Sequence, residues 1–318
     1  MSINTIRFDG RVCLVTGAGA GIGRAHALLF GSRGAKVVVN DMNPTAAQAT
    51  CDEIIQQGGI AVTNTNSVVD GALVVATAID TWGRIDIIVN NAGILRDVSF
   101  GKMTEEQWDI VYDVHAKGTK NICKAAWPIM RKQKYGRIVN TTSVNGLFGQ
   151  AGQANYSFVK AGIIGFSYTL AQEGSRKNIH VNCLAPQAGT AMTKTVAPDS
   201  WTSAMKAEYV SPVVAYLCSE ESKDNGIVVE AGGGWFAQVR WQQSSGYSHA
   251  NLVNSPFTPE VVRDGWDKGK DYETNPPSYP NWDYNDGKKH SSAGHTMNLL
   301  SQGLMVMPSP PTKNKSKL

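Results

Sequence analysis

The sequence predicts an α/β protein built on a doubly wound parallel sheet. Short apolar runs rich in β-branched residues alternate with longer segments of helical spacing, and the apolar runs are continuous instead of alternating with polar residues. Repeated strand–helix units join parallel strands by right-handed crossovers, which place helices on both faces of the sheet. Strands covered on both faces read as unbroken apolar runs, as they do here. We therefore expect a single Rossmann-like domain with a C-terminal extension.

The expected elements follow one another in strict alternation. Seven strands are expected at Val12–Thr16, Lys36–Asn40, Ile60–Asn64, Ile85–Val89, Arg137–Thr142, Ile179–Leu184 and Ile227–Glu230. Six helices are expected at Ala20–Arg33, Pro44–Gln57, Gly71–Trp82, Glu105–Lys132, Ala154–Arg176 and Pro212–Cys218.

The pattern changes toward the C-terminus. Small and polar residues dominate from Thr190 to Lys206, which predicts a mobile segment over the site. We place the dinucleotide-binding domain at residues 1–245 and an extension at residues 246–318. Thr258–Lys268 has the spacing of a short helix within that extension.

Composition excludes several classes of function. The 318 residues carry a net charge of +4, without the basic clustering expected of a nucleic-acid-binding protein. No apolar stretch approaches the roughly 20 residues that span a bilayer. The five cysteines form no C-x-x-C pair, which favours free thiols in a reducing compartment and argues against a zinc or other metal site.

A glycine-rich turn after the first strand predicts a dinucleotide site. Gly17, Gly21, Ile22 and Gly23 open the first helix, where unpaired N–H groups and the helix dipole attract a pyrophosphate. The alternative is a tight turn that serves only helix–strand packing. Asp41 ends the second strand, and a carboxylate there accepts the ribose hydroxyls of NAD and repels the 2′-phosphate of NADP.

Two alternatives accompany the assignment of Asp41 and of NAD as the cofactor. Asp41 also precedes Asn43-Pro44, so it can serve the start of the second helix instead. Arg24, beside the glycine turn, is a residue that can hold a 2′-phosphate, and it argues mildly for NADP.

A second group of residues predicts proton transfer. Tyr156 and Lys160 are four residues apart, which places them on one face of a helix. A neighbouring ammonium is expected to lower the pKa of the phenol, so that Tyr156 exchanges a proton with a substrate oxygen while a hydride moves to or from nicotinamide. Ser143 ends the fifth strand at the carboxyl edge of the sheet, where ligands bind. The stretch Asn91-Ala92-Gly93 after the fourth strand is expected to shape the cofactor floor.

The glycine turn, the NNAG stretch, the Ser143–Tyr156–Lys160 trio and Pro186 together resemble the short-chain dehydrogenase/reductase family over about residues 10–234. The resemblance implies a Ser–Tyr–Lys mechanism in which Lys160 also binds the nicotinamide ribose. It also implies a homodimer joined through the two long helices. Many members carry a catalytic Asn where this chain has His115, and that Asn acts largely through its main-chain carbonyl, a function that His115 can keep.

Several stretches are more similar to one subgroup, the dehydrogenase unit of peroxisomal multifunctional enzymes of type 2. They are VVVND, NNAGILRD, DVHAKG, YGRI, VVAYLC and DNG. His115 is typical of that subgroup, and the loop after Asp41 is shorter than usual in it. The resemblance implies oxidation of (3R)-3-hydroxyacyl-CoA to 3-oxoacyl-CoA in β-oxidation. The terminal Ser316-Lys317-Leu318 matches the address read by the peroxisomal import receptor, which predicts a peroxisomal enzyme with that receptor as a partner.

Other readings remain open at this level. A dehydrogenase of a steroid or another secondary alcohol would use the same residues for hydride transfer. A non-catalytic nucleotide-binding scaffold on this fold is a remote alternative, because such a protein is expected to lose Ser143, Tyr156 or Lys160. Gln187 and Met192 are candidates for the acyl pocket, and Lys194 and Lys206 for the CoA phosphates. Simple packing and surface charge account equally well for these four.

Overall fold

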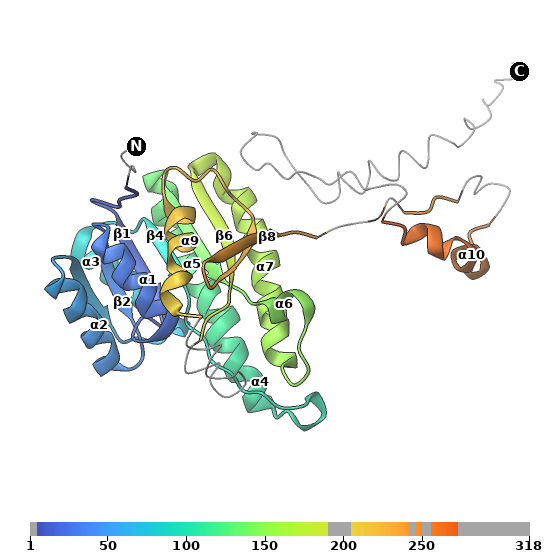
Figure 1. Cartoon of the computed structure of the whole chain (residues 1–318), viewed down its shortest axis with the longest axis horizontal. Helices are drawn as coiled ribbons and strands as arrows, with labels where there is room; N and C mark the ends of the chain where they lie inside the picture. Colours follow the sequence, from blue (N-terminus) through green and yellow to red (C-terminus); the bar gives the residue numbers. More distant parts are fainter. Residues whose placement is uncertain (1–4, 190–204, 242–243, 245, 250–255, 273–318) are drawn as a thin grey trace, which may run out of the picture. The chain divides into compact units, whose positions relative to one another are not determined.

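The computed structural model describes residues 5–189, 205–241, 244, 246–249 and 256–272. An eight-stranded sheet has the order β3-β2-β1-β4-β5-β6-β7-β8 (Figure 1). All neighbouring strands are parallel except β7 and β8. The strands are β1 (Val12–Thr16), β2 (Lys36–Asn40), β3 (Ile60–Asn64), β4 (Ile87–Asn90), β5 (Gly136–Thr141), β6 (Ile179–Pro186), β7 (Val228–Gly232) and β8 (Trp235–Val239).

The helices form one layer on each face of the sheet (Figure 1). The first layer contains α1 (Gly21–Ser32), α2 (Pro44–Gln56) and α9 (Ser211–Cys218). The second contains α3 (Gly71–Trp82), α4 (Glu105–Tyr112), α5 (Gly118–Gln133) and α7 (Ala154–Gly174). Short helical segments are α6 (Val144–Phe148) and the turns η1 (Val68–Asp70), η2 (Phe100–Lys102), η3 (Asp113–Lys117), η4 (Ser175–Lys177) and η5 (Ala207–Tyr209).

The core explains the continuous apolar runs in the sequence. Every residue of β1, β4 and β5 is buried, since helices cover both faces of these strands. The strand order reverses between β1 and β4, the two neighbours that bring the segments after Thr16 and Asn90 to one carboxyl edge. In open parallel sheets this switch point is where ligands bind.

The doubly wound fold class is confirmed, with small shifts at several element ends. Three local features differ from the prediction. The strand near Ile227–Glu230 is followed by β8, which pairs antiparallel with β7. The predicted helix Glu105–Lys132 is divided into α4, the π turn η3 and α5. The sequence did not predict α6, because five residues are too few for a helical period to show.

The compact unit that contains the sheet ends at Val239. Beyond it, the helix predicted at Thr258–Lys268 is confirmed as α10 (Pro259–Gly269), with the Thr258 side chain capping its first turn. The close approach of α10 to the Tyr247 ring requires a glycine at Gly265, where a Cβ would lie 2.5 Å from that ring. The predicted division at residue 245 remains a prediction. The Thr190–Lys206 segment, up to residue 204, and Ser316-Lys317-Leu318 lie outside the described residues.

Candidate active site

The glycine-rich turn between β1 and α1 has the backbone that the sequence predicts for a phosphate-binding site. Gly17 and Gly21 have positive φ angles of 63° and 54°, which side-chain-bearing residues rarely adopt. A Cβ on Gly23 would lie 2.1 Å from the carbonyl oxygen of Gly17, so no larger residue fits there. Ala20, the N-cap residue of α1, provides no side-chain cap, which leaves the first N–H groups of the helix available to an anion. Ile22 is half-buried and packs on the core.

Hydrogen bonds join this turn to the segment after β4. The Thr16 hydroxyl accepts hydrogen bonds from the backbone N–H groups of Asn91 and Ala92, both at 3.0 Å. The Asn91 side chain donates to the carbonyl of Thr16 at 3.0 Å and to that of Gly17 at 3.3 Å. These bonds hold the two sides of the switch point together. Asn91 and Ala92 were predicted site residues, whereas the role of Thr16 was missed.

Asp41 faces the glycine turn. One of its carboxylate oxygens accepts from the N–H of Gly19 at 2.9 Å, and the other accepts from the N–H of Asn43 at 2.9 Å. Asn43, not Asp41, caps α2, with its side chain accepting from Ala46. Each carboxylate oxygen keeps acceptor capacity for a further donor. The guanidinium of Arg24 forms an ion pair with Glu53.

The three predicted catalytic side chains come from the end of β5 and from α7. Ser143 caps α6, and its hydroxyl accepts from the N–H of Asn145 at 3.1 Å. Its side chain lies close enough to Tyr156 to act on the pKa of the phenol. Lys160 lies one turn after Tyr156 on α7, with its Nζ 5.4 Å from the centroid of the phenol ring. Lys160 is buried and its Nζ donates to the carbonyl of Thr141 at 2.6 Å. The three side chains therefore meet at the carboxyl edge of the sheet.

The electrostatics of this trio differ from the prediction. Burial raises the pKa of Tyr156, opposed by the hydrogen bond from Ser143 and assisted by the charge of Asp97. Burial also lowers the pKa of Lys160 to about 7, with a nearby thiol at Cys183 acting in the opposite direction. The expected lowering of the phenol pKa by Lys160 was wrong for the protein alone. The reason is that both groups are desolvated, and burial penalises the charged form of each.

His115 lies in the π turn η3, between α4 and α5. Its Nε2 is 3.0 Å from the backbone N of Ile94 and 2.8 Å from the carbonyl oxygen of the same residue. Its ring packs against Gly93, where a Cβ would lie 2.4 Å from Cε1. Burial, followed by the charge of Lys160, lowers the pKa of His115 to about 3, so the imidazole is neutral. Interruptions of this kind in an α-helix are frequent at functional sites.

Continuous contacts therefore connect the two predicted halves of the site. The carbonyl of Gly17 accepts a hydrogen bond from Asn91, and Ala92 and Gly93 follow Asn91 in the chain. Gly93 packs against the ring of His115, and that ring contacts Tyr156. Pro186 ends β6 and pairs in register with Ala231 of β7, where no described contact joins it to the others.

Several residues that shape the site were not predicted. Asn155 is buried; its side chain accepts from the N–H of Tyr156 at 2.7 Å and donates to the carbonyls of Arg96 and Gln107. A polar residue directly before the predicted catalytic tyrosine was the available signal. Asp97, Asn145 and Gln153 were missed as well, because nothing in their spacing indicates that they meet.

A family model described as short chain dehydrogenase matches residues 11–201, which include every predicted catalytic and cofactor-binding residue. This match covers more than half of the chain. The chain belongs to the short chain dehydrogenase family.

Relatives within this family carry peroxisomal names. The chain is 50% identical over 276 residues to peroxisomal multifunctional enzyme type 2 of Mus musculus, covering 84% of this chain and 37% of that protein. It is 52% identical over 264 residues to the peroxisomal hydratase-dehydrogenase-epimerase of Neurospora crassa, covering 82% of this chain and 29% of that protein. The chain thus spans well under half of either relative, and the predicted resemblance to such enzymes is confirmed.

A solved structure shows the same relationship. The full-length peroxisomal multifunctional enzyme type 2 from Drosophila melanogaster is similar with a TM-score of 0.79 and 39% identity, over 95% of this chain and 51% of that one.

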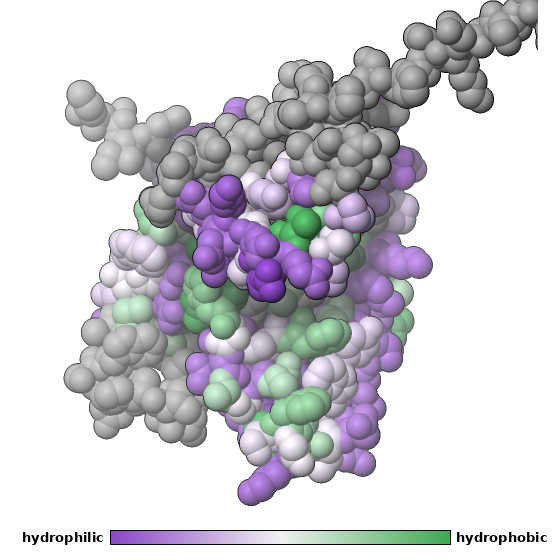
Figure 2. All heavy atoms as spheres, turned by 90° about the vertical axis from the view of Figure 1, so that its right-hand side faces the viewer, coloured by the Kyte–Doolittle hydropathy of each residue, from purple (hydrophilic) through white to green (hydrophobic). Residues whose placement is uncertain are grey.

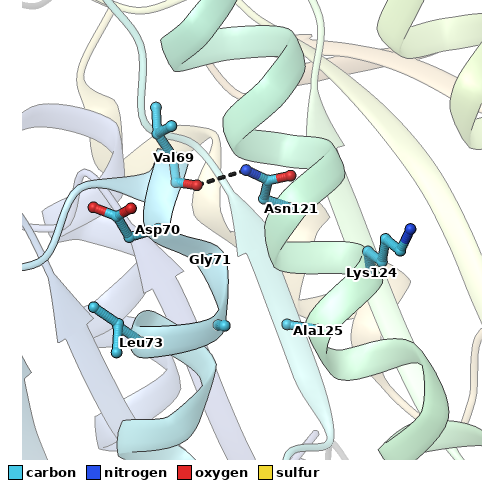
Figure 3. Close-up of a pocket in the computed structure, with 8 residues that line it drawn as sticks. Val69, Asp70, Gly71, Leu73, Asn121, Lys124 and Ala125 are labelled. Carbon is cyan, nitrogen blue, oxygen red and sulfur yellow. Dashed lines mark hydrogen bonds between the residues drawn. The ribbon is translucent and has the colours of Figure 1, made fainter.

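Two pockets lie beside α5, away from the Ser143–Tyr156 pair. The first, of about 350 Å³, lies between α5 and the start of α3 (Figure 3). There the Asn121 side chain donates to the carbonyl of Val69, and Lys124 extends from α5 (Figure 3). The second, of about 470 Å³, lies between α5 and α7 and is lined partly by Trp127, Phe166 and Leu170. Neither pocket is lined by a predicted site residue.

The sequence predicts neither a membrane-spanning segment nor a metal site. Within the part of the chain that the structure describes, no helix is both long and apolar enough to cross a membrane. Among the same residues, no group of three or more His, Cys, Asp or Glu side chains is placed to hold a metal ion.

Proposed function

We propose that this dehydrogenase oxidises (3R)-3-hydroxyacyl-CoA to 3-oxoacyl-CoA with NAD, in peroxisomal fatty-acid β-oxidation. One observation carries the reaction type: Ser143, Tyr156 and Lys160 meet at the carboxyl edge of the sheet and are joined by contacts to the glycine turn. This arrangement brings a proton acceptor next to the place where the fold receives a dinucleotide.

The chain supplies the groups that move and hold the proton. The Tyr156 oxygen takes the proton of the substrate hydroxyl, and the hydroxyl of Ser143 holds the same substrate oxygen in place. Lys160 binds the nicotinamide ribose and, when protonated, stabilises the phenolate. When bound, NAD accepts the hydride that leaves C3 of the substrate. The substrate thus loses one hydride and one proton, and a carbonyl forms.

The residues around the glycine turn fit NAD better than NADP. Asp41 faces the turn with acceptor capacity for two ribose hydroxyls, and its negative charge opposes a 2′-phosphate. Arg24, the side chain that could have favoured the phosphate, is instead engaged by Glu53. The uncapped start of α1 and the open backbone at Gly17 and Gly21 suit the pyrophosphate.

The acyl-CoA substrate and the peroxisomal location rest on the relatives. Their names include a hydratase-dehydrogenase-epimerase and peroxisomal multifunctional enzymes, at 45–52% identity over most of this chain. The subgroup motifs that surround the site, such as Asn90–Asp97 and Asp113–Gly118, support the same substrate class. Recognition by the peroxisomal import receptor belongs to the same proposal.

A homodimer through α5 and α7 is proposed from the surface of these helices. Gly162 and Gly165 stand on the outer face of α7 with open space above them, so a second helix can approach closely. The pocket between α5 and α7 is lined in part by Phe166 and Leu170 of the same helix, and Phe158 is exposed on α7. Hydrophobic side chains are also visible in patches on the face that carries α6 and α7 (Figure 2). Exposed apolar surface of this kind marks interaction sites.

The test is NADH formation by the purified full chain with NAD and matched (3R)- and (3S)-3-hydroxyacyl-CoA. Reduction of NAD with the 3R isomer alone is expected. If neither isomer reacts in protein that binds NAD, the acyl-CoA substrate is refuted, and steroids and other secondary alcohols become the substrates to screen. If the same protein prefers NADP, the assignment of the cofactor is refuted and the reaction type stands.

A further inference from the structure

Two residues, Gln153 and Asn145, connect the exposed carboxylate of Asp97 to the hydroxyl of Ser143. The Gln153 amide donates to a carboxylate oxygen of Asp97 at 2.7 Å. The amide oxygen of Gln153 accepts from the side chain of Asn145 at 2.6 Å. The backbone N–H of Asn145 in turn donates to the Ser143 hydroxyl at 3.1 Å. The Gln153 amide donates to Asp97 and accepts from Asn145, so these two bonds share one direction and reinforce one another.

The positions of these residues in the helices explain why they meet. Ser143 is the N-cap residue of α6, and Asn145 lies in its first turn. Gln153 is the N-cap residue of α7, the helix that carries Tyr156 and Lys160, but its side chain does not cap that helix. Short side chains such as Ser, Thr, Asp and Asn are the usual caps. The longer Gln153 spans the gap between the two helix starts and the loop after β4.

Two further bonds bind the same segments together. The backbone N–H of Val98 donates to the carbonyl of Gly152 at 2.8 Å. The Asn155 side chain donates to the carbonyl of Arg96 at 3.3 Å and accepts from the N–H of Tyr156 at 2.7 Å. Each residue of the loop Arg96–Val98 is thus hydrogen-bonded to a residue at or just before the start of α7. A displacement of Asp97 would be transmitted to both Ser143 and Tyr156.

We infer that Asp97, Gln153 and Asn145 form a positioning relay that holds the Ser143 hydroxyl in front of Tyr156. None of the three needs to touch the reacting atoms. Hydroxyl and amide groups that act through a catalytic side chain work by fixing its geometry, and small misplacements there are costly.

The relay gives Asp97 two separable effects. As a hydrogen-bond acceptor it orients Gln153, whereas as an anion it opposes formation of the phenolate and so helps to raise the pKa of Tyr156. The other groups that face Tyr156 are Lys160 from α7, the neutral His115 from η3 and the Ser143 hydroxyl. Substitution by Asn removes the anion and keeps an acceptor, while substitution by Leu at Gln153 breaks the relay and keeps the anion.

The inference rests on the proposed role of Tyr156, so one readout must be independent of substrate. That readout is the pH titration of phenolate absorbance, taken as the difference between each protein and the same protein carrying Tyr156→Phe. The second readout is kcat and KM for NAD with (3R)-3-hydroxyacyl-CoA. The matched control is Gln150→Leu, the same chemical change at an exposed residue of the same loop, whose side chain makes no described hydrogen bond.

For Gln153→Leu we expect kcat to fall roughly five- to tenfold, the effect of one net hydrogen bond, with KM for NAD unchanged. For Asp97→Asn we expect a small change in kcat and a shift of the Tyr156 titration and of the kcat–pH profile to lower pH. Gln150→Leu should match the parent protein in both readouts.

Equal kcat for Gln153→Leu and Gln150→Leu would overturn the relay, and an unmoved titration in Asp97→Asn would overturn the role of the charge. Thermal unfolding of each variant identifies a general loss of folding. If the parent protein fails to oxidise the acyl-CoA, the titration still tests the effect of Asp97 on Tyr156, so failure of the substrate proposal is distinguishable.

Discussion

The rings of His115 and Tyr156 are perpendicular, with 5.3 Å between their centroids and 88° between their planes. The Nε2 atom of His115 also contacts the backbone nitrogen and the carbonyl oxygen of Ile94, and its ring packs on Gly93. One neutral side chain thus touches the predicted proton acceptor and the predicted cofactor floor. Since burial lowers the pKa of His115 to about 3, we expect this residue to act by position and not by proton exchange.

His115→Phe should separate these functions. Phenylalanine keeps a ring against Tyr156 and Gly93 but loses the hydrogen bond between Nε2 and the backbone of Ile94, so the floor of the cofactor site becomes less well held. We expect KM for NAD to rise several-fold while kcat changes less, because one net hydrogen bond is worth about 1 kcal/mol. Steady-state kinetics with varied NAD tests this. A large fall in kcat with unchanged KM would instead show that His115 takes part in proton transfer.

Tyr156→Phe should remove nearly all turnover. A positioned acid–base group contributes roughly a hundred- to ten-thousandfold in rate, and phenylalanine keeps the ring while losing the only atom that exchanges the proton. NAD affinity, measured by quenching of protein fluorescence, should remain close to that of the parent, because the phenol oxygen is not among the groups that hold the dinucleotide. Substantial residual turnover in this variant would show that another group transfers the proton.

The sequence was sufficient to predict the parallel strands and to place Tyr156 and Lys160 on one helix, because both have local signals. Continuous apolar runs reveal buried parallel strands, and the four-residue spacing of Tyr156 and Lys160 follows from helix geometry. The Asp97–Gln153–Asn145 relay has no such signal, since it joins loops that only the tertiary fold brings together. The raised pKa of Tyr156 was missed for a related reason: spacing shows the ammonium but not the burial that outweighs it.

Asp41→Ala should relax the preference for NAD over NADP. Removing the carboxylate removes both the ribose acceptor and the charge that repels a 2′-phosphate. We expect the ratio of kcat/KM values to fall by about tenfold or more, mainly through weaker use of NAD. The loss of the bond to Gly19 also loosens the turn, so Asp41→Asn serves as the matched control that keeps an acceptor. An unchanged ratio in Asp41→Ala would refute the ribose assignment.

Buried histidines should make the protein sensitive to acid. Burial lowers the pKa of His26 to about 3, and that of His180 to about 4 with assistance from Arg137 and Lys223. Burial likewise lowers the pKa of His115 to about 3. In each case the folded-state pKa lies below the ordinary 6.5, so the unfolded chain binds protons first as the pH falls. Stability is therefore complete above about pH 6.5 and declines below it.

The magnitude and its test follow from His26. Two pH units below its ordinary pKa, this one residue should cost roughly 3 kcal/mol of stability, at about 1.4 kcal/mol per unit. His26 is fully buried and its Nδ1 is 2.8 Å from the Ser211 hydroxyl. His26→Gln is expected to be less stable than the parent at neutral pH but to lose less on acidification. Denaturant unfolding at several pH values measures both; parallel curves for the two proteins would contradict the prediction.

Gly23→Ala should damage both the fold and cofactor binding. The added methyl group would lie 2.1 Å from the carbonyl oxygen of Gly17 and 2.5 Å from the side-chain nitrogen of Asn91, so α1 must move away from the turn. Overpacking of this kind typically costs about 1–3 kcal/mol. We expect lower thermal stability and at least tenfold weaker NAD binding. Gly101→Ala is the matched control, because nothing lies within 4 Å of the added atom and the site is remote in sequence from the turn. If both variants bind NAD as the parent does, the close contact between Gly17 and Gly23 is not required for the dinucleotide site.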